Sequence, residues 1–287
     1  MSAAVPEFQA RIARLFVYPV KSCAGVEVPE ALLTEAGLDL DRAWMVVDAA
    51  GVGVTQRELP RLALVRTQLK HHEVVLRAPG MLALHLQVDA VESPARVRVW
   101  DDEVPAWDMG DVAAQWFTDF LGQKLRLVRF EPEHRRLSNM KWTGGVEAPN
   151  QFSDGYPLLV LGEAALAQLN ERLAARGHAP VGIERFRPNI VLAGGEPHDE
   201  DRVGDFVVAA DGAVRLRMVK PCVRCPIPDI DPVTAERGTS VSDALQGYRS
   251  DARMKGAVTF GMNAIVLEGD GQLLRVGQAV TGGWQFD

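Results

Sequence analysis

The chain has 287 residues, of which 47% are hydrophobic and 24% charged, values that are ordinary for a folded protein and exclude a disordered or fibrous one. Its formal net charge of −7 argues against broad binding to nucleic acid or anionic lipid, because both need a basic surface. The sequence has no apolar run near the roughly 18 residues of a membrane span, no signal-peptide pattern and only three cysteines, so we expect a cytoplasmic protein without a disulfide framework.

The first part of the chain is predicted to be mostly sheet. Short apolar segments bounded by Gly, Pro or Asp indicate strands, and these are Ile12 to Tyr18, Trp44 to Val47 and Leu62 to Gln68. Glu73 to Arg77 and Leu82 to Val88 flank Pro79-Gly80, which predicts a β-hairpin.

One helix is expected to interrupt this sheet. Apolar residues recur at helical spacing over residues 112–121, with Asp111 as the expected N-cap and Gly122 as the expected end. A strand at Leu125 to Phe130 follows. The next segment, Glu131 to Gln151, is polar and has no clear periodicity, so we expect a domain junction or an ordered active-site loop there. At roughly 150 residues per domain, we predict two domains, residues 1–130 and 131–287.

The second half begins with a helix and then returns to sheet. Leu166, Leu169 and Leu173 form the apolar stripe of the helix, which Gly177 is expected to end. Later segments indicate strands, namely Phe206 to Ala209 and Val214 to Val219 around the turn Asp211-Gly212, then Ala264 to Leu267 and Leu274 to Val276. Strands with few helices favour an α+β, mainly β fold that contains a barrel over a Rossmann sheet, and no Gly-x-Gly-x-x-Gly motif follows a strand.

A Cys-x-x-Cys pair, Cys222-Val223-Arg224-Cys225, stands between a predicted strand and Pro226-Ile227-Pro228. Such a pair can be half of a zinc site, a redox dithiol, one metal-ligating thiolate beside a second cysteine, or two buried apolar side chains. Zinc needs about four ligands, and Cys23 is distant with no histidine at motif spacing. A redox dithiol prefers a helix N-terminus, which the two prolines disfavour. The spacing of the pair alone selects none of these.

Several further motifs occur in a fixed order along the chain. They are Tyr18-Pro19-Val20-Lys21-Ser22-Cys23-Ala24-Gly25, Asp41-Arg42-Ala43-Trp44, Arg185-Phe186-Arg187-Pro188-Asn189 and Lys220-Pro221-Cys222-Val223-Arg224-Cys225 with Asp231-Pro232 downstream. From about Arg11 to Trp284 the chain resembles a MOSC N-terminal domain followed by a MOSC domain. The pattern is similar to that of the mitochondrial amidoxime reducing components and their bacterial counterparts. The resemblance implies a β-barrel MOSC core preceded by a sheet-rich α/β N-terminal domain.

The resemblance also implies a molybdenum cofactor, Mo-molybdopterin, and places its contacts on particular residues. The expected cofactor-binding positions are Lys21, Ser22, Arg42, Tyr156, Arg187, Asn189, Arg224, Cys225 and Asn263. Cations and hydroxyls suit the cofactor's phosphate, and an amide suits the edge of its pterin. Cys225 is the implied metal ligand, with Arg224 expected beside it and Cys222 as a neighbour. Asp154 is implied to be catalytic, either by holding a substrate amine or by relaying a proton.

The implied function is reduction of small N-hydroxylated compounds, hydroxylamines and amidoximes, to amines. Three cysteines cannot hold a cluster of the four-cysteine type and no flavin motif is visible, so we expect a separate electron-transfer protein as the donor, either ferredoxin-like or a flavoprotein reductase. The alternative within the family is a carrier of the cofactor or of sulfur, in which Cys225 would hold a persulfide or pass the cofactor on. A non-catalytic protein with structural zinc or buried cysteines is the alternative of a different class.

Overall fold

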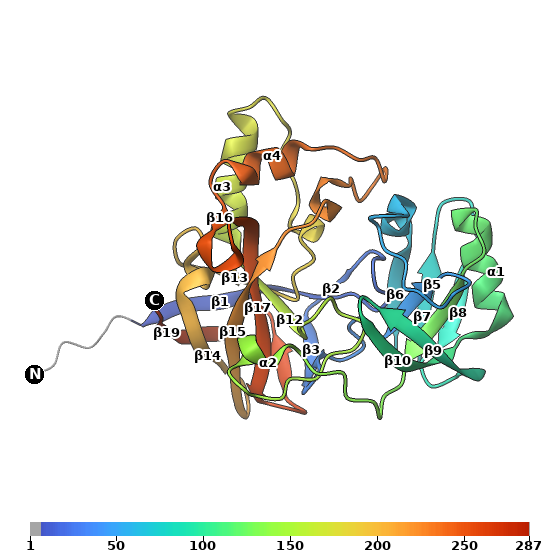
Figure 1. Ribbon diagram of the computed structural model, residues 1–287. Helices are drawn as coiled ribbons and strands as arrows, with labels where there is room; N and C mark the ends of the chain where they lie inside the picture. The colour runs from blue at the N-terminus through green and yellow to red at the C-terminus, as the bar shows by residue number, and fades with distance from the viewer. Residues whose placement is uncertain (1–6, 287) are drawn as a thin grey trace, which may run out of the picture.

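The computed structural model describes residues 7–286, and within them seven strands form a closed barrel (Figure 1). In the order of their pairing these are β12 (Leu158–Gly162), β13 (Ile190–Ala193), β1 (Phe8–Val17), β19 (Ala279–Trp284), β14 (Val203–Ala209), β15 (Ala213–Val223) and β17 (Ala257–Glu268). The barrel closes because β17 also pairs with β12. The prediction of a mainly β fold that contains a barrel is confirmed.

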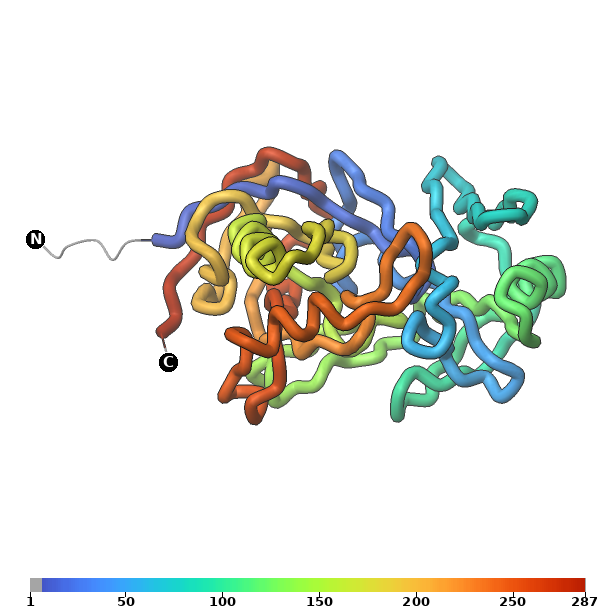
Figure 2. Tube along the Cα trace, turned by 90° about the horizontal axis from the view of Figure 1, so that it is seen from above, coloured from blue at the N-terminus to red at the C-terminus, as the bar shows by residue number. Residues whose placement is uncertain are grey.

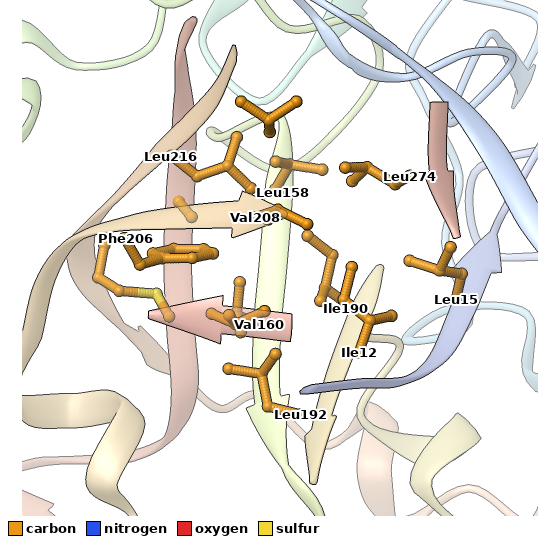
Figure 3. Close-up of a cluster of buried hydrophobic side chains, with 14 of the residues drawn as sticks. Ile12, Leu15, Leu158, Val160, Ile190, Leu192, Phe206, Val208, Leu216 and Leu274 are labelled. Carbon is orange, nitrogen blue, oxygen red and sulfur yellow. The ribbon is translucent and has the colours of Figure 1, made fainter. Parts of the chain in front are cut away.

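Apolar side chains that alternate along these strands fill the barrel (Figure 3). Ile12 from β1, Val160 from β12 and Leu216 from β15 are fully buried there, and Phe206 from β14 is nearly so. Two helices, α3 (Glu163–Ala174) and α4 (Ser240–Gln246), cover one side of the barrel and bury a second apolar cluster against it. None of the helices within residues 7–286 has the length and hydropathy needed to cross a bilayer.

The rest of the first half forms smaller sheets beside the barrel. A four-stranded sheet contains β5 (Trp44–Val47), β11 (Arg126–Phe130), β10 (Asp102–Asp108) and β9 (Ser93–Val99). A three-stranded sheet contains β6 (Arg66–Lys70), β7 (Glu73–Arg77) and β8 (Leu84–Gln87), and helix α1 (Gly110–Leu121) packs with it into one core. Shorter elements join these parts, namely β2 (Val26–Val28), β3 (Glu30–Thr34), β4 (Gly37–Leu38), α2 (Met140–Thr143), β16 (Ser250–Asp251) and β18 (Leu273–Arg275).

Strand β1 comes from the first half of the chain but lies within the barrel built by the second half. It pairs antiparallel with β13 on one side and with β19 on the other, so that Arg11 lies opposite both Ala193 and Ala279. The chain therefore starts in the barrel, leaves it to build the smaller sheets, and returns at β12 (Figure 1). The division of the chain at residue 130 stays a prediction.

Most of the predicted strands are present, and three local predictions need correction. The segment predicted as one strand, Leu62 to Gln68, is a 3-10 turn at Pro60–Leu64 followed by β6, because Pro60 fixes φ near helical values. Asp111 lies inside the first turn of α1 rather than at its cap, and the carboxylate of Asp108 instead accepts from the amide of Gly110 at 2.7 Å. Helix α3 ends at Ala174, before Gly177.

Gly261 allows the closing strand β17 to approach β12. Its φ is +79°, and a Cβ at this position would lie 2.8 Å from the carbonyl oxygen of Val160. We expect Gly261→Ala to lower the free energy of unfolding by about 2 kcal/mol, since the left-handed backbone and the close carbonyl both oppose a side chain. Gly283→Ala, where a Cβ meets open space, should change it by less than about 0.5 kcal/mol in urea unfolding. Equal losses in the two variants would contradict this account.

Candidate functional site

A cavity beside the barrel brings together segments that are far apart in the sequence. Its wall includes all ten residues singled out from the sequence, which are Lys21, Ser22, Arg42, Asp154, Tyr156, Arg187, Asn189, Arg224, Cys225 and Asn263. They come from the loop after β1, the turn before β5, the loop before β12, the turn before β13, the end of β15 with its following loop, and β17. The segment after β15 extends across to the first half, where Arg237 donates to the carbonyl of Arg57 at 2.5 Å (Figure 2).

Three residues of this wall have a left-handed backbone, although none is a glycine. The φ angles are 65° at Ser22, 52° at Arg42 and 60° at Arg187. Such angles cost free energy for residues with a side chain, and they gather where the surrounding structure overrides local preference, commonly at functional sites. Here they turn two guanidinium groups and a hydroxyl into the same cavity.

The two guanidinium groups of Arg42 and Arg187 both lie 4.3 Å from the centre of the Tyr18 ring. Arg42 is fixed by Asp41 at 2.5 Å and by the side-chain oxygen of Asn189 at 3.1 Å. Arg187 donates from Nη1 to the carbonyl of Cys23 at 2.6 Å, while its buried Nη2 has no partner among residues 7–286. Burial and the nearby charge of Arg42 lower the pKa of Arg187 to about 10. An anion bound in this cavity would relieve both penalties.

Asn189 holds this part of the site in place. Its side-chain oxygen also accepts from the amide of Leu159 at 3.2 Å, and its side-chain nitrogen donates to the carbonyl of Phe16 at 3.2 Å. The residue is 1% exposed. The hydrogen-bonding capacity of Asn189 is therefore used largely by the barrel, by Arg42 and by Asp41.

The two cysteines of the pair have different neighbours. Arg224 donates to the sulfur of Cys222 at 3.0 Å and to the carbonyl of Phe186 at 3.1 Å, and it lines the same cavity as Cys225. Arg57 lies within hydrogen-bonding reach of Cys225 instead. The reason is geometric, because Cys222 lies on β15 beside Arg224 whereas Cys225 lies in the loop beyond the strand. Both thiols are free and partly exposed.

Cys23 differs from these two cysteines. It is fully buried in the apolar core of the first half, and burial raises the pKa of its thiol to about 12. A thiol in this state is not nucleophilic at neutral pH. The structure therefore supports the expectation that Cys23 packs rather than reacts.

Asp154 is placed at the mouth of the cavity between two cations. Lys21 donates to one oxygen at 2.5 Å and Arg57 to the other at 3.3 Å. Burial opposes ionisation of the Asp154 carboxyl, but the charges of Lys21 and Arg57 outweigh it and hold its pKa well below the usual range. Lys21 also donates to the carbonyl of Phe152 at 2.7 Å, and burial lowers the pKa of its own amine. Asp154 is therefore an anion at neutral pH.

Arg136 holds the loop that carries Asp154 in place through hydrogen bonds to its backbone and side chains. This buried guanidinium donates to the carbonyls of Gln151 and Ser153, both at 2.8 Å, and to the side-chain oxygen of Asn150 at 2.7 Å. It also forms an ion pair with Asp102 at 2.7 Å. The expectation of an ordered loop before β12 is thus supported at its C-terminal end.

Tyr156 and Asn263 complete the wall on the side of the barrel. The Tyr156 hydroxyl is buried without a partner among residues 7–286, and burial raises its pKa to about 12. Asn263 donates to the carbonyl of Lys220 at 3.1 Å. The Nε of Arg224 is likewise buried and unpaired within the described part of the chain. Together with Nη2 of Arg187, these atoms leave polar groups that a bound molecule could satisfy.

The cavity is strongly cationic in a chain of net charge −7. The charged residues of its wall are Lys21, Arg42, Arg57, Arg187 and Arg224 against Asp154. Sequence reasoning did not find Arg57, because the segment around it has no motif or periodicity that sets it apart from a surface arginine. Within residues 7–286, no three or more His, Cys, Asp or Glu side chains form a group that could hold a metal by themselves.

Comparison with known proteins assigns the family. Residues 9–124 match the MOSC N-terminal beta barrel domain and residues 147–281 match the MOSC domain. Mitochondrial amidoxime-reducing component 1 of Mus musculus is 35% identical, covering 94% of this chain and 81% of its own length. Mitochondrial amidoxime reducing component 2 of Homo sapiens is 34% identical, covering 83% and 72%. Molybdenum cofactor sulfurase of Danio rerio is 31% identical over 88% of this chain but 31% of its own length. The chain therefore belongs to the MOSC family, with a MOSC N-terminal domain followed by a MOSC domain.

Proposed function

We propose that this protein is a molybdenum-cofactor-dependent oxidoreductase that reduces N-hydroxylated compounds to amines. The observation that carries the proposal is a cavity in which five cations surround an accessible thiol, Cys225, in an otherwise acidic protein. The names of its amidoxime-reducing relatives agree with this reaction.

The residues of the cavity fit such a cofactor. A phosphate would satisfy the unpaired Nη2 of Arg187 and reduce the repulsion between Arg187 and Arg42. Lys21 and Ser22 would add an ammonium and a hydroxyl, and Cys225 would supply a soft thiolate to a metal that already has sulfur ligands. When bound, the cofactor would supply the two-electron chemistry that breaks the N–O bond. Two electrons and two protons convert R–NHOH to R–NH₂ and water.

In this proposal Asp154 holds the substrate. Lys21 and Arg57 keep its carboxyl ionised, so at neutral pH it accepts hydrogen bonds and has no proton to give. An anionic acceptor suits the N–H groups of a hydroxylamine or an amidoxime. The structure therefore favours the positioning role of Asp154 over the proton relay, and the protons would come from solvent at the cavity mouth.

The electrons would come from a separate electron-transfer protein. Within residues 7–286 the chain offers three cysteines, one of them buried in a core, which is too few for a four-cysteine cluster. A ferredoxin-like protein or a flavoprotein reductase would serve as this donor.

The alternative of a cofactor or sulfur carrier is favoured by one observation, the similarity to a molybdenum cofactor sulfurase. Both functions would use the thiol of Cys225, so the measurement that distinguishes them is catalytic turnover. Protein purified from a host that makes the cofactor should contain molybdenum, and should give the fluorescence of an oxidised pterin after iodine treatment. With a chemical electron donor it should reduce benzamidoxime. Loaded protein without turnover would favour the carrier of the cofactor. Protein with zinc or no metal would refute the reductase and the cofactor carrier, and a persulfide on Cys225 in mass spectrometry would then identify a sulfur carrier.

Arg57 provides a sharper test of the site. Its guanidinium contacts Asp154 and lies beside Cys225, so we expect Arg57→Gln to lower kcat for benzamidoxime about tenfold, the value of one charge-assisted hydrogen bond of about 1.4 kcal/mol. The pterin content should stay unchanged, since Arg57 contacts Asp154 whereas Arg42 and Arg187 lie against the ring of Tyr18. Arg61→Gln, whose guanidinium lies over Phe120, is the matched control and should retain full activity. Unchanged kcat in Arg57→Gln would exclude Arg57 from the reaction.

A further inference from the structure

A second cavity adjoins the cationic one and shares part of its wall. The shared residues are Asp154, Gly155, Tyr156, Cys222, Val223 and Asn263. Its volume is about 530 Å³, within the range of about 300–1,000 Å³ typical of small-molecule sites. This second cavity, which we call the outer cavity, therefore reaches Asp154 and Cys222 but not Arg42 or Arg187.

The charge of the outer cavity differs from that of the inner one. Its wall holds three carboxylates, Asp101, Asp102 and Asp154, against two cations, Arg136 and Lys220. Arg136 is paired with Asp102, and Lys220 lies 5.6 Å from the ring of Trp142, whereas the side chain of Asp101 has no hydrogen-bond or ion-pair partner among residues 7–286. The excess of carboxylates over cations suits a neutral or cationic molecule better than an anion.

Trp100 stands at the rim of the outer cavity in an unusual conformation. It occupies the turn of the β9–β10 hairpin, where Val99 pairs with Asp102, and its φ is +56°. A bulky residue rarely has this backbone angle, and turns of this kind normally use Gly or Asn. Packing does not compensate for the cost, because the residue is 52% exposed. An aromatic residue that is both strained and exposed indicates a binding role.

The ring of Trp100 connects the two cavities. The guanidinium of Arg57 lies 4.8 Å from the centre of its ring, and the same guanidinium contacts Asp154 and lies beside Cys225. Trp100 lines the outer cavity, whereas Arg57 does not. Trp100 and Arg57 together line a third cavity. One side of the indole is thus taken by Arg57, while the side toward the outer cavity stays available to a flat molecule.

We propose that Trp100 is a specificity-determining residue, the stacking surface of a substrate subsite in the outer cavity. The subsite takes a flat aromatic group on the carbon that bears the reacting N-hydroxylated nitrogen, with Asp101 disfavouring anions and favouring cations. This inference rests on the proposed function for the identity of the reacting group. The reacting end lies at Asp154 on the shared wall, and the aromatic end lies over Trp100.

The test measures binding as well as turnover, in cofactor-loaded protein. Benzamidine, the flat cationic product expected from benzamidoxime, should bind in calorimetry, and benzoate, an anion of the same shape, should not displace it. Trp100→Ala should raise the Kd for benzamidine about tenfold, the value of an aromatic stacking contact. Trp100→Phe should raise it less than about threefold. Phe286→Ala, an exposed aromatic residue outside this cavity, is the control and should leave Kd unchanged.

The kinetic part separates this inference from the reaction itself. With a chemical electron donor, Trp100→Ala should raise KM for benzamidoxime about tenfold. The KM for acetamidoxime, which has no ring, should stay within about twofold of the wild-type value. Wild-type protein that does not bind benzamidine, or equal effects on the two amidoximes, would overturn the subsite. Binding that depends on Trp100 without any reduction of benzamidoxime would refute the proposed reaction and keep the subsite.

Discussion

Cys225→Ser should lower the reduction of benzamidoxime by at least about 1,000-fold, the largest effect that we expect from any single substitution. A hydroxyl is a poor substitute for a soft thiolate on a metal held by sulfur. Cys225 is partly exposed in a loop, so its replacement should leave the free energy of unfolding within about 0.5 kcal/mol of the wild type. The measurements are initial rates with a chemical electron donor, molybdenum content, and urea unfolding.

Cys222→Ser is the matched control, because the two cysteines are three residues apart in the chain and differ in their partners. Cys222 accepts from Arg224, and a serine oxygen can accept the same hydrogen bond. We therefore expect a loss of less than about tenfold with the metal retained. Equal losses at Cys222 and Cys225 would show that the pair acts as a unit and would refute the assignment of a single metal ligand.

Glu200→Gln should raise the free energy of unfolding more at neutral and alkaline pH than at pH 4.5. The difference between the two effects should be up to about 3 kcal/mol. Glu200 is 2% exposed, and one of its oxygens accepts from the amide of Gly162 at 3.1 Å. Burial, with a further contribution from the charge of Asp201, raises its pKa to about 7 from 4.5. Each unit of this difference corresponds to about 1.4 kcal/mol of stability.

The sign follows from which state binds the proton. Below pH 4.5 the carboxyl is protonated in both the folded and the unfolded chain, so its contribution to stability is fully present. Between pH 4.5 and 7 the unfolded chain releases the proton and the folded one keeps it, so the wild type loses stability as pH rises. Glutamine cannot titrate and keeps the acceptor for Gly162. Urea unfolding of both proteins from pH 4.5 to 8 tests this, and a constant difference between them would contradict it.

The sequence predicted those parts of the fold that depend on local pattern. The runs at Trp44–Val47 and Glu73–Arg77 became strands with the predicted bounds, because apolar side chains within a few residues determined them. Leu62 to Gln68 also begins with an apolar run, yet Pro60 turns its first part into a 3-10 helix. The pairing of β1 with β19 joins residues about 270 apart, and no local pattern encodes it.

The site was predictable to the extent that its residues belong to motifs. The cavity gathers the cations of four separate motifs, and a phosphate-binding role requires such an arrangement. Arg57 and Trp100 were not found, because each reaches the site through a turn of the first half whose position depends on the whole fold. The sequence also did not show which of the two cysteines accepts a hydrogen bond from Arg224, and the structure gives that bond to Cys222.

The position of β1 has a consequence for how the protein is made. Because Phe8 pairs with Gly282, a ribosome must release almost the entire polypeptide before the ring of strands can be completed. Until then β1 and β14 each lack β19 as a neighbour and expose unpaired amide and carbonyl groups, the feature that leads nascent sheets to aggregate. A fragment that begins at residue 131 would lack this strand permanently. We expect the barrel to close slowly and the chain to need chaperones during synthesis. The reason is that the last pairing to form, between β1 and β19, joins residues that are far apart in the sequence.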